Sequence, residues 1–483
     1  MQTITLAMSV DDIIGKVQNA VWGWPLIILI LAAGVWLTVR TGFVQVRHLG
    51  KALKFMVKNE DNGEGEVTSF GALCTALSAT IGTGNIVGVA TAICLGGPGA
   101  LLWMLLAAFF GMATKYSEGF LAIKYREKKD DSHYLGGPFY YIEKGMGSKW
   151  KWLAKLFAVF GICVGLFGIG TFTQINGIAT AVQDFFDPES AHVAFTLLGN
   201  DYTWATVIGG LVVTLCVALV VLGGIQRIAK VSQVIVPFMA ITYVVFALVI
   251  VLGHITAIPA AVKLICQSAF DPQAALGAAT GVTIKLAMQK GIGRGIFSNE
   301  AGLGSAAAAK TKDTVRQGLV TMTGTFIDTI VICTLTGLSI VVTGAQNAFV
   351  AGSVEGVKIT SRAWQTGLPW NGRFSAFVLM LCLAFFAFTT ILGWNYYSER
   401  CLEYLVGSQK FTKVYRYLYI LAVFIGPYLT VAAVWNIADI CNGLMAFPNL
   451  IALFALSGVV GKETRAYFAE KRHDLKAMAQ DKK

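Results

Sequence analysis

Long apolar runs separated by short polar segments occupy most of the chain. A helix needs roughly 20 mostly apolar residues to cross the hydrocarbon core of a bilayer. The pattern predicts eleven membrane-spanning helices, at residues 21–39, 68–95, 98–122, 152–181, 203–222, 231–252, 260–292, 318–343, 374–399, 414–431 and 433–458. Counts of ten or twelve spans stay open. The expected fold class is therefore an all-α polytopic membrane protein.

The composition is that of a chain whose main solvent is lipid. Hydrophobic residues make up 55% of the sequence and charged residues only 13%, whereas soluble domains use about 25% charged residues. The formal net charge is +11, but the Lys and Arg residues lie between apolar runs, and a nucleic-acid footprint would be clustered on a soluble module. We therefore expect membrane lipid as a partner and no nucleic acid. The nine cysteines show no metal-ligand spacing, which indicates small buried hydrophobes.

The distribution of basic residues predicts the orientation in the membrane. Cytoplasmic loops of membrane proteins are rich in Lys and Arg. If the amino terminus lies outside, most of the 38 Lys and Arg residues fall in or beside cytoplasmic segments, including the basic tail 460–483. The acidic loop 183–203, which has no Lys or Arg, then lies outside. We expect a multi-pass protein of the plasma or inner membrane with a cytoplasmic carboxyl terminus.

A polar, glycine-rich cluster interrupts the middle of the second apolar run, at Gly82, Thr83, Gly84 and Asn85. Backbone that leaves the helix inside a bilayer persists only where it faces protein or a water-filled site. A helix broken at mid-membrane is therefore a candidate binding site. The alternative is a close packing surface between helices, because Gly84 and Gly88 have small-xxx-small spacing.

A second interruption is predicted in the run 260–292, at Gly277, Thr280 and Gly281. Paired glycine interruptions at corresponding places in two halves are the best sequence sign of a transporter built from inverted repeats. The expected organisation has an extra amino-terminal helix with a cytoplasmic amphipathic segment, two five-helix repeats and a basic tail. These parts correspond to residues 1–66, 67–253, 254–459 and 460–483.

The ends of a broken helix supply the chemistry for binding a charged solute. The amino-terminal end at Gly84–Ile86 presents N–H groups and the positive end of a helix dipole, which suit a carboxylate. The carboxyl-terminal end at Ala79–Gly82 presents carbonyl oxygens, which suit a sodium ion. One interruption can thus hold an amino acid together with a coupling cation.

Hydroxyl and amide side chains in other spans are further candidates. Thr389 and Thr390 offer hard oxygen ligands for a cation, although each hydroxyl could instead bond the carbonyl one turn earlier. Gln174 and Asn176 could meet a solute or bond a neighbouring helix. Trp394 could pack or close one side of a pocket.

Two carboxylates, Asp328 and Asp439, lie inside apolar runs. Intramembrane carboxylates are costly, so a functional role is the default interpretation. Structural pairing is the alternative, because Asn436 and Asn442 lie at helical spacing from Asp439. Near an inner helix end, Lys115 and Glu118 have the spacing of a local ion pair.

Several function classes lack their motifs. The sequence has no GxxxxGK[ST], so ATP is not expected to supply the energy, and it has no HExxH or GxSxG, so no enzyme is expected. A passive channel would show rings of charge or a repeated filter motif, and neither is found. No cofactor is expected apart from sodium as a coupling ion.

Five segments together resemble the alanine/glycine:cation symporter family, the sodium-coupled amino-acid carriers. They are RTGFVQVRH at 40–48, SATIGTGNIVGVATAICLGGPGALLWM at 78–104, GMATKYSE at 111–118, GRGIFSNEAGLGSA at 293–306 and FTTILGWNYYSER at 388–400. The resemblance implies the leucine-transporter-like fold, with five helices repeated in inverted orientation and one extra amino-terminal helix. It also implies that Asn299 and Glu300 gate the inner side.

The interpretation is a symporter that imports a small neutral amino acid, alanine or glycine first, with sodium. Proton coupling, a preference for glutamine and a passive channel are the alternatives. The expected substrate-binding residues are Thr83, Gly84, Asn85, Gln174, Gly277, Thr280 and Trp394. The expected sodium ligands are Thr80, Gly82, Thr389 and Thr390.

Overall fold

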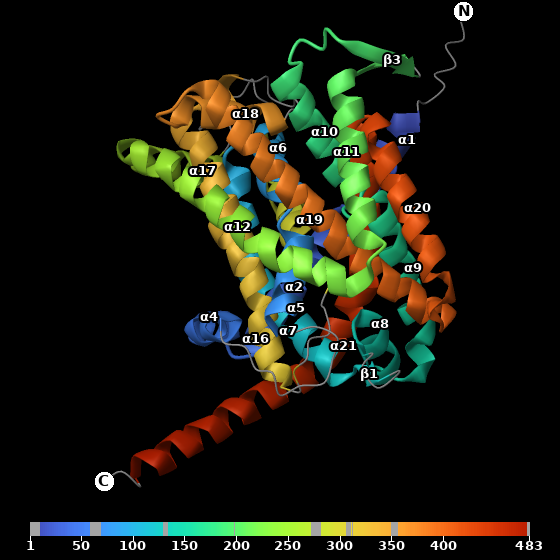
Figure 1. The fold of residues 1–483 in the computed structure, drawn as a ribbon. Coiled ribbons are helices and arrows are strands. Elements are labelled where there is room, and N and C mark those ends of the chain that lie inside the picture. Colours follow the sequence, from blue (N-terminus) through green and yellow to red (C-terminus); the bar gives the residue numbers. More distant parts are fainter. Residues whose placement is uncertain are drawn as a thin grey trace, which may run out of the picture.

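The computed structural model is a bundle of helices in which α1 and the last turns of α21 lie at opposite ends (Figure 1). The structure describes residues 10–57, 69–128, 134–197, 199–271, 282–305, 311, 313–348 and 356–480. Two short antiparallel hairpins lie outside the bundle. One pairs β1 (Glu127–Lys128) with β2 (Tyr134–Leu135), and the other pairs β3 (Val193–Leu197) with β4 (Asn200–Thr203).

The first half of the chain contains α1 (Val10–Val21), α2 (Trp24–Arg40), α3 (Val44–Arg47), α4 (Leu49–Val57), α5 (Ser69–Thr80), the π-helical η1 (Gly84–Gly88), α6 (Val89–Gly96), α7 (Gly99–Lys124), α8 (Pro138–Tyr140), η2 (Tyr141–Gly145), η3 (Ser148–Trp150), α9 (Lys151–Phe167), α10 (Phe172–Phe186), α11 (Trp204–Val221) and α12 (Gly224–Gly253). The second half contains η4 (Ile255–Ala257), α13 (Ile258–Phe270), α15 (Ile284–Asn299), α16 (Thr314–Thr325), the π-helical η6 (Phe326–Cys333), α17 (Thr334–Thr343), η7 (Ala345–Ala348), α18 (Gly356–Gly367), α19 (Gly372–Val406), η8 (Gln409–Phe411), α20 (Thr412–Ile425), η9 (Gly426–Tyr428) and α21 (Val431–Gln480).

Among the described residues, eight helices are long and apolar enough to cross a membrane, or up to nine if one bent pair counts as a span. The eight are Ile13–Arg40, Gly99–Lys124, Ser148–Phe186, Trp204–Val221, Gly224–Gly253, Thr314–Thr343, Gly372–Val406 and Val431–Glu470. The bent pair is Leu73–Thr80 with Gly84–Gly96. These helices agree with the polytopic helical membrane protein that the sequence predicts.

The remaining two predicted spans do not form long helices. At 414–431 the chain forms α20, which has 14 residues, fewer than the roughly 20 that a span needs. The run 260–292 contains α13 and α15, with 13 and 16 residues, and the predicted interruption at Gly277 and Thr280 lies outside the described residues. The count of eleven and the two five-helix repeats therefore stay predictions.

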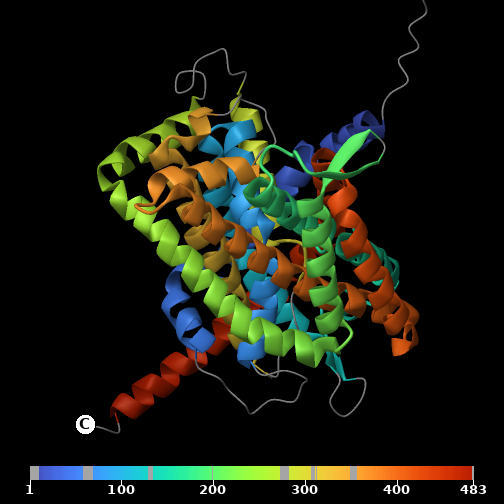
Figure 2. The ribbon, with the colours of Figure 1, turned by 45° about the horizontal axis from the view of Figure 1, so that its top comes forward.

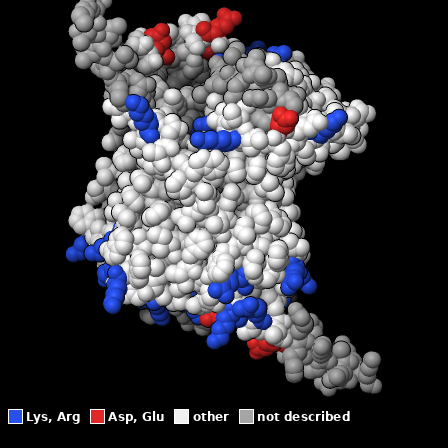
Figure 3. Space-filling view, turned by 180° about the vertical axis from the view of Figure 1, so that it is seen from behind, with Lys and Arg blue, Asp and Glu red and all other residues white. Residues whose placement is uncertain are grey.

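The outside of the bundle has the surface of a membrane protein. In Figure 3 a broad belt without charged side chains separates two rims that carry Lys, Arg, Asp and Glu. Figures 1 and 2 both show α12 running obliquely across the outside of the bundle. Large apolar side chains of α11 and α12 are exposed there, among them Leu215, Leu219, Val234 and Ile241. Such a continuous apolar surface fits contact with lipid.

The core surrounds α7, most of which is buried. This helix packs closely on α15 and α16, and small residues bring the backbones together. A Cβ atom on Gly291 of α15 would lie 2.2 Å from the carbonyl oxygen of Ala100. A Cβ atom on Gly99, the first residue of α7, would lie 2.2 Å from the backbone nitrogen of Ala269 in α13. These glycines let the helices approach to a distance that a side chain would prevent.

We expect Gly99→Ala to lower the stability of the purified protein by about 1–3 kcal/mol, since the added methyl group must displace the backbone of α13. The measurement is thermal unfolding in detergent. Gly253→Ala is the matched control, because a Cβ atom at that position meets nothing within 4 Å. Equal unfolding temperatures for both variants would show that the contact between α7 and α13 is not tight.

Candidate functional site

The second apolar run is interrupted where the sequence predicts. Helix α5 ends at Thr80, η1 begins at Gly84, and the two parts are bent by 43°. We call residues 81–83 the first interruption. Its backbone groups find side-chain partners: Gly82 N donates to Asn85 Oδ1 at 2.9 Å, and Thr83 N donates to Gln174 Oε1 at 3.0 Å. Polar backbone that leaves a helix in a bilayer needs such partners.

Three helices meet at the first interruption so closely that glycine is required. A Cβ atom on Gly82 would lie 2.5 Å from Thr390 Oγ1 and 2.9 Å from Gln174 Oε1. A Cβ atom on Gly84 would lie 3.0 Å from the Cα atom of Ser298 in α15. Gly88, by contrast, has room for a side chain, with no atom nearer than 3.9 Å. Gly84 therefore serves close packing as well as the interruption.

The fourth predicted span, 152–181, is also interrupted, beside the first interruption. Helix α9 ends at Phe167 and α10 begins at Phe172. Gln174 connects this second gap to the first, because its Nε2 donates to the carbonyl of Ile169 at 2.9 Å while its Oε1 accepts from Thr83. The sequence analysis missed this gap, although the nearby glycines in GLFGIGT, residues 165–171, were a signal for it.

Neighbouring threonines on α19 have different surroundings. Thr390 Oγ1 lies 3.2 Å from the carbonyl oxygen of Ile81 in the first interruption and 3.0 Å from that of Phe386. Thr389 Oγ1 bonds Phe386 O at 3.0 Å and lies 3.4 Å from Met239 Sδ on α12. The two side chains point apart because consecutive helical residues are about 100° apart.

The structure thus brings together only part of the predicted sodium group. Gly82 and Thr390 meet at the first interruption, whereas the contacts of Thr389 are on α19 and α12. The hydroxyl of Thr80 bonds back to its own helix, at 3.4 Å from Ala76 O and 3.3 Å from Leu77 O. All three threonine hydroxyls bond a carbonyl of their own preceding turn, and only that of Thr390 also reaches a carbonyl of the first interruption.

Asp328 lies beside the first interruption and is fully buried. Its carboxylate accepts from Asn85 Nδ2 at 2.7 Å, Ser298 Oγ at 2.9 Å and Thr329 Oγ1 at 2.6 Å. All these donors are neutral, and no Lys or Arg in the described part of the chain forms an ion pair with it. A buried carboxylate without a cation is costly, so a bound cation or a proton would stabilise this arrangement.

Helix α15 ends at Asn299, in the stretch that the family resemblance identifies as a gate on the inner side. Beyond Asn299, Glu300, Gly302 and Gly304 all have left-handed backbone, with φ of 56°, 94° and 80°. We call residues 300–305 the inner interruption. Glu118 Oε1 accepts from the amides of Gly302 and Gly304, each at 3.0 Å, and Asn449 Nδ2 donates to Gly302 O at 2.7 Å.

Buried charges surround the inner interruption. Lys115 Nζ lies 3.6 Å from Glu118 Oε2 and 4.0 Å from Glu300 Oε2, and it donates to Ser305 Oγ at 2.8 Å. The indole N–H of Trp394 donates to Glu300 Oε1. Lys115 and Glu118 therefore form the predicted local pair, and Lys115 also pairs with Glu300, the residue directly after α15.

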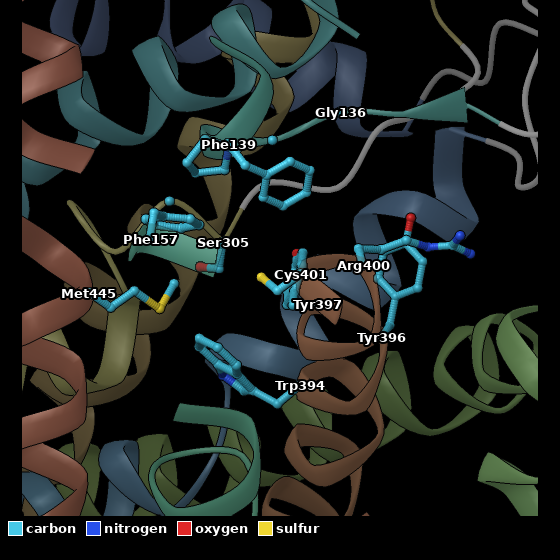
Figure 4. A pocket seen from close by; sticks show the side chains of 13 residues that line it. Gly136, Phe139, Phe157, Ser305, Trp394, Tyr396, Tyr397, Arg400, Cys401 and Met445 are labelled. Carbon is cyan, nitrogen blue, oxygen red and sulfur yellow. The ribbon is translucent and has the colours of Figure 1, made fainter. Parts of the chain in front are cut away.

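An aromatic pocket lies next to the inner interruption. Gly304 and Ser305 line it together with Phe139, Phe157, Trp394, Tyr396, Tyr397, Arg400, Cys401 and Met445. Figure 4 shows Phe139, Phe157, Trp394 and Met445 around this pocket, with Trp394 contributed by α19. Trp394 thus donates to Glu300 of the inner interruption and lines this aromatic pocket, while its predicted contact with a substrate stays a prediction.

Asp439 of α21 forms a buried ion pair with Arg294 of α15. Arg294 contacts both of its carboxylate oxygens, at 3.0 and 2.9 Å, and Gln18 Nε2 donates to Oδ2 at 3.1 Å. The guanidinium also stacks over Trp435, 4.4 Å from the ring centre. We call this group the outer pair. Asp439 is thus paired with Arg294 rather than with the asparagines on its own helix.

Comparisons with known proteins agree with a membrane carrier. A family model described as "Sodium:alanine symporter family" matches residues 7–482. The chain is 44% identical to the "Sodium/alanine symporter AgcS" of Methanococcus maripaludis, over 97% of this chain and 100% of that protein. It is 52% identical to an "Uncharacterized transporter" of Haemophilus influenzae, over 95% of this chain and 97% of that protein.

Among solved structures, the crystal structure of MhsT in complex with L-phenylalanine matches with a TM-score of 0.51 and 12% identity. The match covers 83% of this chain and 99% of that chain. At this identity the likeness shows the fold alone, which is the leucine-transporter-like fold.

Removing either side of the outer pair should destabilise the protein. We expect Arg294→Met and Asp439→Leu each to lower the stability by about 3–5 kcal/mol, because each leaves a buried charge without its partner. The double variant should lose less than the sum. Thermal unfolding of the three variants checks this, and strictly additive losses would contradict a direct interaction.

Proposed function

Because the chain belongs to the sodium:alanine symporter family, we propose that it imports a small neutral amino acid, alanine or glycine first, together with sodium. The single observation that carries this proposal is the first interruption, where carbonyl, hydroxyl and amide groups of three helices converge. The protein works by alternating access, so that this site opens to one side of the membrane at a time.

The amino-terminal end of η1 supports binding of the carboxylate of an amino acid. Backbone N–H groups and the helix dipole favour an anion at such an end. Thr83 lies immediately before it, and its hydroxyl is buried with no hydrogen-bond partner among the described residues. The small residues Gly82 and Gly84, which pack closely against Thr390 and Ser298, favour a solute with a short side chain such as alanine or glycine.

The geometry around Ile81 supports a cation site. The carbonyl oxygen of Ile81 and the hydroxyl of Thr390 lie 3.2 Å apart, close enough to ligate the same ion. Carbonyl oxygens at the carboxyl-terminal end of a half-helix are suited to sodium. The proposed sodium ligands are therefore Ile81, Gly82 and Thr390. The hydroxyls of Thr80 and Thr389, which bond back to their own helices, are expected to lie outside the ion's coordination shell.

Proton coupling is the second candidate, and Asp328 is the observation that favours it. This carboxylate touches Asn85 of η1 and has no cationic partner in the described chain. It could bind a proton, or a cation in addition to the one proposed near Thr390.

Glutamine stays an alternative substrate. The size of the pocket also depends on the second predicted interruption, at Gly277 and Thr280, which lies outside the described residues.

A passive channel fits the geometry less well than a carrier does. Helix α15 is held by the outer pair through Arg294 and by the inner charges through Glu300. Both groups are buried and connect α15 to other helices, as two closures of a carrier would. A carrier needs two closures that open in turn, whereas a channel needs a route open at both ends.

The proposed topology has the amino terminus outside and the carboxyl terminus in the cytoplasm. The basic residues after Gly461 support it, because α21 continues through them to the end of the bundle opposite α1 (Figure 1). The inner interruption and the aromatic pocket then face the cytoplasm.

Uptake of labelled alanine into proteoliposomes tests the function. We expect an inward sodium gradient to accelerate uptake and a potassium gradient of equal size to have no effect. Uptake driven by a proton gradient without sodium would show that the coupling ion is a proton. Uptake that neither gradient changes would contradict symport.

Two neighbouring threonines test the cation site. We expect Thr390→Val to lower sodium-driven uptake about tenfold or more, as loss of a charge-assisted oxygen contact implies. Thr389→Val is the matched control, because it removes the same hydroxyl one position away, and its uptake should stay near that of the unmodified protein. Equal loss in both variants would mean that the ion does not lie against Ile81.

A further inference from the structure

Asn442, in the first third of α21, carries a buried side-chain amide. Its exposed fraction is 0%, and neither Oδ1 nor Nδ2 has a hydrogen-bond partner among the described residues. An amide has two donors and an acceptor with two lone pairs. Leaving all of them unpaired in a buried position is unfavourable, so the side chain is expected to meet another molecule during function.

The spacing along α21 fixes the direction in which Asn442 points. Trp435, Asn442 and Asn449 are each seven residues apart, and such positions share one face of a helix. Trp435 packs on Phe297 of α15, with ring centres 4.8 Å apart. Asn449 donates to the carbonyl of Gly302 at 2.7 Å. Asn442 lies midway between them and therefore faces the carboxyl end of α15, where the inner interruption begins.

Asn442 also lies between the two closures of the route. Asp439, one turn earlier on α21, belongs to the outer pair. Met445, almost one turn later, lines the aromatic pocket with Trp394. At the same level of α15, Ser298 approaches Gly84 at the start of η1. The face of Asn442 is thus turned toward the part of α15 that packs on the start of η1, where we propose that the solute binds.

We propose that Asn442 is a substrate-binding residue that helps to determine specificity. Its Oδ1 accepts a hydrogen bond from the ammonium group of the amino acid, and its Nδ2 remains available to donate to a second polar group of the solute. This assignment rests on the proposed function, with the carboxylate at the start of η1. It adds α21 to the helices that contact the substrate.

The chain offers a matched control in Asn395 of α19. This amide is also 0% exposed, and both of its polar atoms lack partners in the described residues. It lies five positions after Thr390, which turns it about 140° away from the first interruption. It shares a face with Ile391, whose carbonyl accepts from Tyr419 of α20. Asn395 therefore has the burial of Asn442 without its position.

The test compares Asn442→Leu with Asn395→Leu, since leucine replaces the amide by an apolar group of similar size. Both variants should keep or raise the unfolding temperature, because each removes unpaired polar atoms. We expect Asn442→Leu to raise the KM for alanine uptake about tenfold, as loss of a hydrogen bond to a charged group implies, and to weaken stabilisation by alanine. Asn395→Leu should leave both unchanged.

An unchanged KM and unchanged stabilisation by alanine in Asn442→Leu would overturn the inference, provided that the unmodified protein transports alanine. A lower unfolding temperature with an unchanged KM would assign Asn442 a structural role only and would also overturn it. If the leucine variant does not fold, Asn442→Ala is measured in the same way and should raise the KM likewise. Failure of the unmodified protein to take up alanine would instead count against the proposed function.

Discussion

Backbone groups that leave a helix inside a bilayer must find partners in the protein, and this constraint organises the whole structure. At the first interruption the partners come from Asn85, Gln174 and Thr390, which belong to η1, α10 and α19. Each of these side chains is held by its own helix, so the interruption fixes how the helices approach one another. The glycine at position 82 follows from the same requirement, because any side chain there would separate the helices.

Buried ion pairs also connect distant helices. Arg294 of α15 pairs with Asp439, and Glu300, directly after α15, pairs with Lys115. This helix is therefore fixed at two points, one on either side of the first interruption. Buried ion pairs add little net stability but are costly to break one partner at a time. Such ion pairs therefore suit a protein with a few discrete conformations, in which one pair separates while the other stays intact. Asp328 differs because all its described hydrogen-bond partners are neutral.

The sequence predicted the helical membrane fold and the first interruption, since apolar runs and clustered glycines are local signals. It did not place the gap at Gly168–Thr171, where the partner Tyr419 comes from a distant helix. The resemblance pointed to Asn299 and Glu300, but not to the contacts of Glu118 with the amides that follow them. The sequence also could not separate Thr389 from Thr390, as only the packing of α19 decides which hydroxyl meets Ile81. Asp439 was recognised as unusual, but its partner lies on another helix.

The proposed function requires the first interruption to hold the solute and its driving ion together. A crystal structure of the protein with alanine and sodium bound would test this. We expect the alanine carboxylate at the amino-terminal end of η1 and an ion between the carbonyl of Ile81 and the hydroxyl of Thr390. A continuous helix through residues 80–85, with alanine bound elsewhere in the bundle, would contradict it.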